Sequence, residues 1–469
     1  MHGRDAIIFV PGLFVEGGVQ SADVAARRIA RAFDENAATH DAQFLVLEGK
    51  DESLADDYRT RKATVVRLDV DGVELPIVDV FDFRYHDTLL GAYQNRTPAR
   101  QALSITGTLL ALFGRVMTSI RKPSKTAAEK WQVAYGVLVM LGLVAYVGVL
   151  LATAIATLPA VVPGSSNRQV AVASPPTTTA SPVTTRTPQT RAPAPVGGRR
   201  PGRPWIERAR DTGRSVWAGA TGTARAGWTA LRSPALLGRL QGLLVILTAI
   251  GLLRTQSLKT VLREVAAGAA AASAYLATGE RAARVRGAFG RLLQHVLESK
   301  VEGRAYERIH VVAFSFGSVV ALDSIFPVVR PAHHLGRIST LVTIGCPFDF
   351  IRTYWPRYFD DRQGLPDAPG KWLNVFAGAD VLGSNFLDEP AKQAVAKPRG
   401  IRMTNGAEER IPESLRYGGV RDLADQPLSE RLTLVGFRTH RRAYWDGVES
   451  DSCFHDIVPV LYAEHAAMR

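Results

Sequence analysis

Ser315 is the residue whose surroundings best suit a chemical role. It lies at the centre of AFSFG, residues 313–317, between the apolar run IHVVAF and the helix-compatible segment SVVALDSIF. Small residues two positions before and after a serine suit a sharp strand-to-helix turn, because that turn brings the strand and the helix close together. Such a turn presents the hydroxyl as a nucleophile. The alternative is an ordinary serine at the start of a helix.

A serine hydroxyl needs partners before it reacts, and the chain offers them downstream of Ser315. A histidine must take the hydroxyl proton, and a carboxylate must orient that histidine. Asp380 follows the strand-like run WLNVFA, and His440 follows the strand-like run LTLVGF. Other acids and histidines keep this assignment open: Asp349, Asp360, Asp361, Asp388, His333, His334 and His455.

Attack by a serine on a carbonyl group also requires donors for the negative charge that develops on the carbonyl oxygen. One donor would be the backbone N–H of Phe316, the residue after the nucleophile. The other is expected in VPGLFVEGG, the loop after the first apolar run, from Leu13 or Phe14. Together these groups would form the oxyanion hole of a hydrolase.

Alternating apolar runs and helical segments predict the scaffold that positions these residues. The first 90 residues contain the apolar run AIIFV, the amphipathic segment SADVAARRIARAF and a hairpin signal at Asp71-Gly72. Later in the chain, IHVVAF, TLVTIG, WLNVFA and LTLVGF alternate with helical stretches. This alternation is typical of an α/β fold with a mostly parallel sheet, helices on both faces and reactive groups at the carboxyl ends of the strands.

Two apolar runs in the middle of the chain predict a transmembrane helical hairpin that interrupts this fold. Residues 131–162 contain no charge and exceed the roughly 20 residues that a membrane-spanning helix needs. Residues 236–253 form a second, weaker run, for which a buried helix is the alternative. Residues 163–204, between the runs, are rich in Pro, Thr and Arg and are expected to be disordered. An even number of crossings would return the chain to the side that it left.

The formal net charge of +13 does not predict nucleic-acid binding, because most of the excess lies in one segment. Residues 163–235 contain many arginines but only two acids, and they include no recognisable groove-reading module. Cys346 and Cys453 provide neither a disulfide framework nor a metal-binding spacing. No metal and no organic cofactor is predicted.

In several segments the chain resembles the α/β-hydrolase superfamily, specifically its bacterial lipase- or esterase-like members. The matching segments are, in order, IIFVPGLF, VDVFDFRYHD, RIHVVAFSFGSVVALDSIF, LVTIGCPFDF, WLNVFAGADVL and THRRAYWD. The resemblance implies a serine hydrolase in which Ser315, Asp380 and His440 form the catalytic triad. The chain departs from the family's pattern at Ala313, where glycine is usual, and at Pro11, where many members have histidine. The spacing between the histidine and the following Tyr-Trp pair also differs by one residue.

We therefore expect a membrane-anchored serine hydrolase that cleaves ester bonds in lipid or acyl substrates. Thioester hydrolysis or acyl transfer would use the same groups. The protein would be integral to the cell membrane through two spans, with the lipid bilayer as partner and the catalytic domain on the cytoplasmic side. The sequence does not predict an oligomeric state. The alternative is a non-catalytic membrane scaffold or interaction protein with a degenerate hydrolase fold.

The expected organisation has five segments. Two of them form the hydrolase domain, and the other three form the insertion between its parts. They are residues 1–100, the first part of the hydrolase domain; 101–162, a connecting helix and the first span; 163–204, a disordered linker; 205–256, a basic helix and the second span; and 257–469, the second part of the hydrolase domain.

Overall fold

A computed structural model describes most of the chain outside its middle. The described residues are 4–13, 22–36, 43–55, 58–68, 71–91, 97–120, 256–365, 367–378, 380, 382–388, 397–404, 409–417, 443–445, 452–462 and scattered positions between 132 and 147. The chain forms two compact units, one made of Met1–Ile155 with Leu253–Arg469 and the other of Ala156–Leu252. Every described residue belongs to the first unit.

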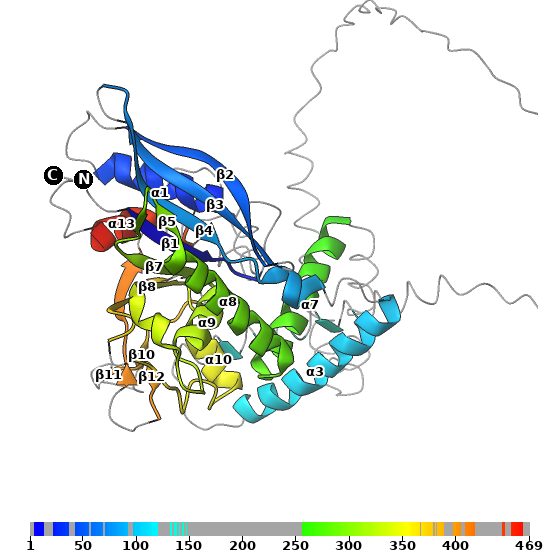
Figure 1. The fold of residues 1–469 in the computed structure, drawn as a ribbon. Coiled ribbons are helices and arrows are strands. Elements are labelled where there is room, and N and C mark those ends of the chain that lie inside the picture. The colour runs from blue at the N-terminus through cyan, green and yellow to red at the C-terminus, as the bar shows by residue number, and fades with distance from the viewer. Residues whose placement is uncertain are drawn as a thin grey trace, which may run out of the picture. The chain divides into compact units, whose positions relative to one another are not determined.

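An eight-stranded sheet forms the centre of the first unit (Figure 1). Neighbouring strands from β14 to β4 are parallel, and β3 and β2 follow in antiparallel orientation at one edge. The order across the sheet is β14 (Glu413–Tyr417), β9 (Lys371–Ala377), β8 (Ile338–Ile344), β7 (Ile309–Phe314), β1 (Asp5–Val10), β4 (Glu74–Asp82), β3 (Tyr58–Leu68) and β2 (Gln43–Ala55).

Strand β1 joins strands from the two ends of the chain into one sheet. It lies between β4 and β7, with Phe9 opposite Asp82 on one side and Val10 opposite Ala313 on the other. All residues of β1 and β7 are buried, because helices cover both faces of the sheet here. The carboxyl ends of β1 and β7 consequently meet at the same edge.

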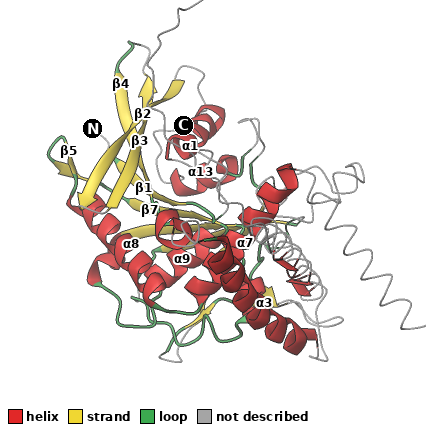
Figure 2. Ribbon diagram, turned by 90° about the vertical axis from the view of Figure 1, so that its right-hand side faces the viewer, coloured by secondary structure: helices red, strands yellow, loops and turns green. Residues whose placement is uncertain are grey.

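Helices cover both faces of the sheet, and the two layers are separate in Figure 2. Ile7 and Phe9 of β1 pack in the core beneath α1 and α13, whereas Ile8 and Val10 pack in the core beneath α8 and α9. Side chains on a strand alternate between faces, so each face has its own apolar core. The helices are α1 (Ala22–Asn36), α3 (Pro98–Ile120), α7 (Gln256–Leu276), α8 (Glu280–Glu298), α9 (Phe316–Ile325), α10 (Phe348–Tyr354) and α13 (Phe454–Tyr462).

A third apolar cluster lies outside the two cores of the sheet. Ile105 and Leu112 of α3 pack there with Ala270 of α7 and Tyr354 of α10. The remaining short elements are η1 (Asp87–Gly91), η2 (His333–Arg337), β5 (Lys300–Val301), β6 (Arg304–Ala305), β10 (Leu387–Asp388), β11 (Lys397–Pro398), β12 (Ile401–Arg402) and β13 (Glu409–Arg410).

The predicted fold class is wrong in its transmembrane helical hairpin. No helix within the described ranges is long and apolar enough to cross a membrane. The long helices α3 and α7 are interrupted by charged residues, namely Arg100, Arg115, Lys259, Arg263 and Glu264. The predicted second span, 236–253, lies outside the described residues, as do the linker 163–204 and, apart from Gln256, the segment 205–256.

The first predicted span, 131–162, is described only at scattered positions, and several of these contact the rest of the protein. Leu143 is 1% exposed and belongs to the same cluster as Ile105 and Leu112 of α3. The backbone carbonyl of Gln132 accepts a hydrogen bond from the Tyr354 hydroxyl at 3.0 Å. These contacts explain the error, because an apolar run can be covered by protein as well as by lipid. The cell-membrane localisation and the bilayer partner stay predictions.

Candidate active site

Ser315 occupies the turn between β7 and α9 with an unusual backbone conformation. Its φ is 55° and its ψ is −127°. Positive φ is uncommon outside glycine, and holding a residue in a sparsely populated region costs on the order of 1–3 kcal/mol. The backbone N–H of Ser315 donates to the carbonyl of Ile344 in β8 at 2.8 Å, and its carbonyl accepts from the N–H of Ser318 at 2.9 Å. The neighbouring strand and the first turn of α9 therefore hold the strained residue in place.

Two glycines allow β1 to approach this turn closely. A Cβ at Gly317 would lie less than 3.0 Å from the carbonyl oxygens of Val10 and Pro11, which real Cβ atoms essentially never do. A Cβ at Gly12 would lie 3.0 Å from the Cβ of Ser315. The small residue required two positions after the serine is thus explained by contact with β1, and Ser315 lies directly beside the loop after β1.

Side chains from the segment after β4 hold the loop after β1 by contacts with the loop's backbone carbonyl groups. The Tyr85 hydroxyl donates to the carbonyl of Pro11 at 2.8 Å, and Nε2 of His86 lies 2.6 Å from the carbonyl oxygen of Gly12. In a planar trans peptide the C=O and the following N–H point in opposite directions. The N–H of Leu13 consequently points away from His86. Phe14, the other predicted donor from this loop, lies outside the described residues.

Asp380 follows β9 and is held by a buried tyrosine. One carboxylate oxygen of Asp380 accepts from the Tyr444 hydroxyl at 2.8 Å, and the other accepts from the N–H of Leu382 at 2.9 Å. The Tyr444 hydroxyl also accepts from the N–H of Ala377 at 3.1 Å. Burial, and then the Asp380 carboxylate, raise the pKa of Tyr444 well above its usual value, so this hydroxyl stays a donor. Asp380 itself is only 7% exposed.

The competing acids have other surroundings. Asp349 lies in the first turn of α10, where it forms an ion pair with Arg399 and accepts a hydrogen bond from the Ser384 hydroxyl. Asp360 and Asp361 lie in the segment between α10 and β9, and the backbone of Asp388 pairs with Lys397 in the small β10–β11 sheet. Asp380 is therefore the better candidate, because its carboxylate accepts two neutral donors at the carboxyl end of a sheet strand.

His440, the predicted base, lies outside the described residues. Among the competing histidines, His333 and His334 lie in η2, which immediately precedes β8. They therefore lie at the amino end of β8, whereas Ser315 follows the carboxyl end of its parallel neighbour β7. His455 lies on α13 and pairs with Glu35 of α1, with 3.0 Å between Nδ1 and a carboxylate oxygen.

Ser315 lines an apolar cavity of about 110 Å³ between α3, α7 and α10. Most of the described residues around it are apolar, including Leu13, Leu112, Leu276, Phe316, Phe350 and Leu382. An apolar wall with a few polar groups is the kind of lining that is typical of small-molecule sites. The two predicted donor residues Leu13 and Phe316 thus share one cavity with Ser315.

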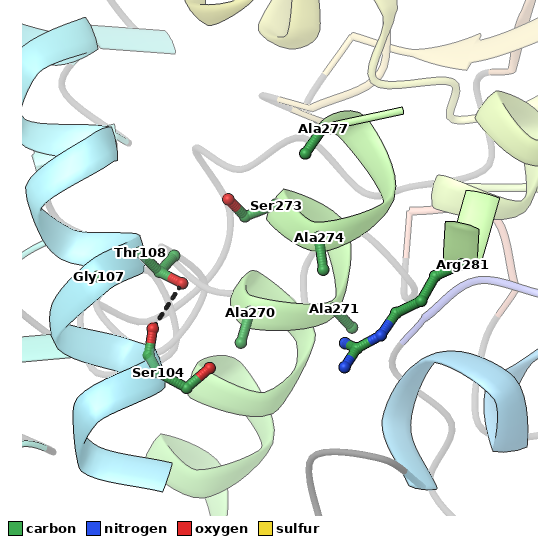
Figure 3. Close-up of a pocket in the computed structure, with 9 residues that line it drawn as sticks. All are labelled: Ser104, Gly107, Thr108, Ala270, Ala271, Ser273, Ala274, Ala277 and Arg281. Carbon is green, nitrogen blue, oxygen red and sulfur yellow. Dashed lines mark hydrogen bonds between the residues drawn. The ribbon is translucent and has the colours of Figure 1, made fainter. Parts of the chain in front are cut away.

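A second cavity, of about 380 Å³, lies beside the first and is shown in Figure 3. Small residues and hydroxyl groups line it, together with Arg281 of α8. Thr108 of α3 and Ser273 of α7 line both cavities. The two cavities therefore share part of their walls, and the second has more hydrogen-bonding groups.

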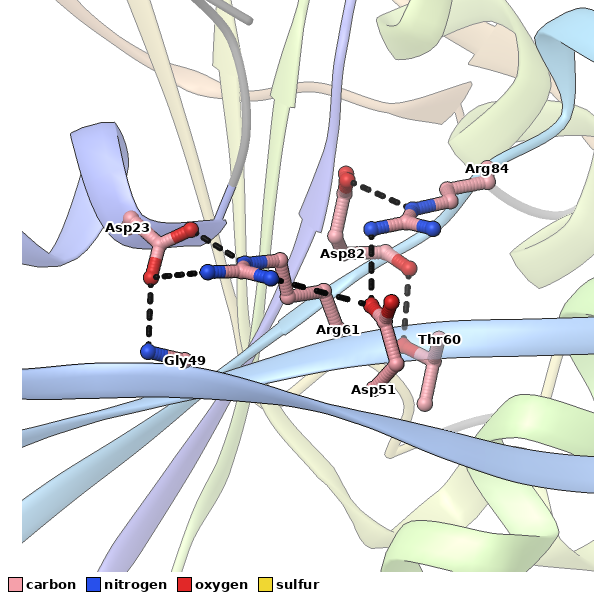
Figure 4. Close-up of polar contacts among 7 residues, drawn as sticks. All are labelled: Asp23, Gly49, Asp51, Thr60, Arg61, Asp82 and Arg84. Carbon is pink, nitrogen blue, oxygen red and sulfur yellow. Dashed lines mark hydrogen bonds and ion pairs between the residues drawn. The ribbon is translucent and has the colours of Figure 1, made fainter.

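A polar cluster lies at the end of β4 and ties α1 to the antiparallel strands (Figure 4). Asp23 of α1 pairs with Arg61 of β3, and Arg84 lies 3.1 Å from Asp51 of β2 and 3.4 Å from Asp82. Burial raises the pKa of the Asp82 carboxyl to about 7, although Arg84 opposes this rise. Within the described residues, no group of three or more His, Cys, Asp or Glu side chains could hold a metal ion.

No protein-family model, no curated protein and no solved structure matches this chain. The resemblance to the α/β-hydrolase superfamily therefore stays a prediction. One fold can host many reactions, so the function is inferred from the residues of the site.

Four residues of the site were not identified from the sequence. Tyr444 contacts Asp380, Tyr85 and His86 hold the loop after β1, and Arg115 lines the cavity beside Ser315. Tyr85 and His86 follow the apolar end of β4, so the rule that reactive groups gather at carboxyl ends could have identified them. Arg115 and Tyr444 had no such signal, because they reach the site only through tertiary packing.

Proposed function

We propose that this protein is a serine hydrolase that cleaves ester bonds through Ser315, His440 and Asp380. The observation that carries the proposal is the strained backbone of Ser315 at the β7–α9 turn, in the wall of an apolar cavity. A serine held at positive φ where strand and helix meet is the arrangement that exposes a nucleophilic hydroxyl. The order of the three residues along the chain is that of α/β hydrolases.

In the proposed reaction, the Ser315 hydroxyl oxygen attacks the ester carbonyl carbon while His440 takes the hydroxyl proton. The carbonyl oxygen becomes negative and accepts hydrogen bonds from the N–H groups of Phe316 and Leu13. His440 gives the proton to the departing alcohol, which leaves an acyl group on Ser315. Water then attacks the acyl group with the same proton transfers and releases the acid. Asp380 orients His440 and stabilises its charged form.

Tyr444 supports the pairing of Asp380 with His440. Its hydroxyl donates to the Asp380 carboxylate, and Tyr444 is the fourth residue after His440. Four residues span at most about 14 Å even when fully extended. The covalent chain therefore keeps His440 in the neighbourhood of the carboxylate that would orient it.

A fluorophosphonate probe tests the proposal, because it forms a covalent bond with activated serines only. The purified protein should be labelled, Ser315→Ala should abolish labelling, and His440→Ala should reduce it strongly. Ser299→Ala, at the end of α8, is the control and should be labelled like the unaltered protein. Absence of labelling in folded protein would favour the alternative, a non-catalytic scaffold or interaction protein.

A further inference from the structure

A cationic side chain lies in the wall of the apolar cavity that contains Ser315. Arg115 of α3 lines this cavity, and no other charged residue does so within the described part of the chain. The surrounding side chains, such as Leu112, Phe350 and Leu382, offer no negative charge. The presence of a charged arginine in this apolar wall needs a physical explanation.

The described contacts of Arg115 fix its orientation without neutralising it. Its guanidinium carbon lies 4.1 Å from the centroid of the Trp355 ring, and one terminal nitrogen donates to the carbonyl of Tyr354 at 3.1 Å. No described carboxylate lies within ion-pair distance of this guanidinium. Partial burial lowers the pKa of Arg115 from its usual value, which is the effect of an uncompensated charge removed from water.

Removing a cation from water is unfavourable unless an anion and hydrogen bonds replace the water. A bound anion would supply both the opposite charge and the hydrogen-bond acceptors here. Guanidinium presents its N–H groups in a planar fork that matches a carboxylate or a phosphate. Trp355 and Tyr354 hold that fork in one orientation before any ligand arrives. Less side-chain freedom is then lost on binding.

We propose that the substrate carries an anionic group, a carboxylate or a phosphate, which Arg115 binds while Ser315 attacks an ester carbonyl in the same molecule. The proposal rests on the serine hydrolase function above and narrows its substrate class. Because both residues line one cavity of about 110 Å³, the anionic group and the ester are joined by a short apolar segment. The adjoining cavity, with Thr108 and Ser273 in its wall (Figure 3), places hydroxyl groups beside the cavity that Arg115 lines.

Matched esters test this proposal. The mono-4-nitrophenyl ester of adipic acid carries a carboxylate, and 4-nitrophenyl 6-methylheptanoate has nearly the same shape without charge. The protein should hydrolyse the anionic ester with a kcat/KM about tenfold to hundredfold higher, the range expected for a charge-assisted hydrogen bond. 4-Nitrophenyl 5-phosphonopentanoate, compared with the same neutral ester, shows whether a phosphate-like group is preferred to a carboxylate.

The preference should depend on Arg115 specifically. Arg115→Gln should bring the ratio of kcat/KM for anionic to neutral ester close to one, and Arg115→Lys should give an intermediate ratio because the charge remains without the planar fork. Arg100→Gln is the matched control, since Arg100 is an exposed arginine on the same helix. It should leave the ratio unchanged. If Arg115→Gln does not fold, the ratios of kcat/KM for the unaltered protein and for Arg115→Lys test the proposal.

The outcomes separate this proposal from the proposed function. Hydrolysis of both esters at similar rates by the unaltered protein would overturn the anionic substrate and leave the hydrolase standing. If neither ester is hydrolysed and Ser315 is not labelled, the proposed hydrolase function is rejected. Calorimetric titration with adipate and with inorganic phosphate then tests anion binding at Arg115. Binding to the unaltered protein that is lost in Arg115→Gln supports the site. No binding to the unaltered protein rejects it.

Discussion

Gly317 lies two residues after the proposed nucleophile, where α9 starts against the end of β1. An alanine there would put its Cβ less than 3.0 Å from the backbone oxygens of Val10 and Pro11, and backbone atoms cannot rotate away as a side chain can. We expect Gly317→Ala to lower the free energy of unfolding by about 1–3 kcal/mol, as overpacking does. Labelling of Ser315 should fall with it. Urea denaturation measures the first effect and the fluorophosphonate probe the second.

Gly287 provides the control for that substitution. It lies within α8, and a Cβ there would meet only a terminal nitrogen of Arg291, at 3.8 Å. Gly287→Ala should stabilise the protein by up to about 1 kcal/mol, because alanine favours a helix over glycine. Equal effects of the two substitutions would show that β1 does not restrict the turn.

Asp82 is a buried carboxyl group whose charge opposes folding. Its pKa is about 7 in the folded protein against 3.8 for an unperturbed aspartate. The folded protein therefore holds this proton more tightly than the unfolded chain does, and stability falls as the pH rises from about 4 to about 7. Asp82→Asn should remove this contribution, which amounts to up to about 4 kcal/mol at 1.36 kcal/mol for each pKa unit.

Urea denaturation at pH 5 and pH 8 measures the effect of Asp82. The unaltered protein should lose more stability between these values than Asp82→Asn does, and the variant should be the more stable of the two at pH 8. Above pH 7 the difference between them should no longer change. An identical pH dependence in both proteins would mean that Asp82 is not the group responsible.

At the scale of elements, the segment after β4 controls the loop after β1. His86→Ala removes the donor to the Gly12 carbonyl and frees the peptide that carries the Leu13 N–H. We expect kcat for ester hydrolysis to fall by roughly tenfold to hundredfold with little change in KM, since small misplacements of catalytic groups have effects of this size. His86→Gln keeps a side-chain donor and should recover part of the rate. If His86 were instead the general base, His86→Gln would be as inactive as Ser315→Ala.

The sequence predicted those elements whose apolar runs are short and bounded by turns. IHVVAF, TLVTIG and WLNVFA correspond to β7, β8 and β9, and the hairpin signal at Asp71-Gly72 lies in the turn between β3 and β4. β14 was missed because its sequence, ESLRY, is largely exposed and has no apolar run. The strand predicted at LTLVGF lies outside the described residues. The long apolar run at 131–162 led to the wrong fold prediction. The apolar pattern of a segment does not show whether other helices or lipid cover it.

The site was predictable to the extent that it depends on strand ends. Ser315 could be identified as a candidate because small residues around a serine after a buried strand are explained by a close strand-to-helix turn. Asp380 could be identified because it follows β9 directly. Arg115 could not, since α3 is distant in sequence from Ser315 and no local pattern shows which of its faces meets α7 and α10.

At the scale of the whole molecule, the sheet depends on strands from both ends of the chain. β1 pairs with β4 on one side and with β7 on the other, and all six of its residues are buried. Removal of β1 would expose the apolar faces of α9 and β7 together with an unpaired strand edge. Residues 1–155 and 253–469 should therefore hold together without a covalent connection, because Met1–Ile155 and Leu253–Arg469 form one compact unit.

A specific protease site placed after Thr178, in the segment rich in Pro and Thr, tests this dependence. After cleavage, the two pieces should elute together from a gel-filtration column, separate in urea, and retain fluorophosphonate labelling of the piece that contains Ser315. The uncut protein treated with inactive protease is the control. Two pieces that separate under native conditions, with labelling intact on one of them, would show that β1 is dispensable. The proposed oxyanion loop after β1 would then have to be abandoned as well.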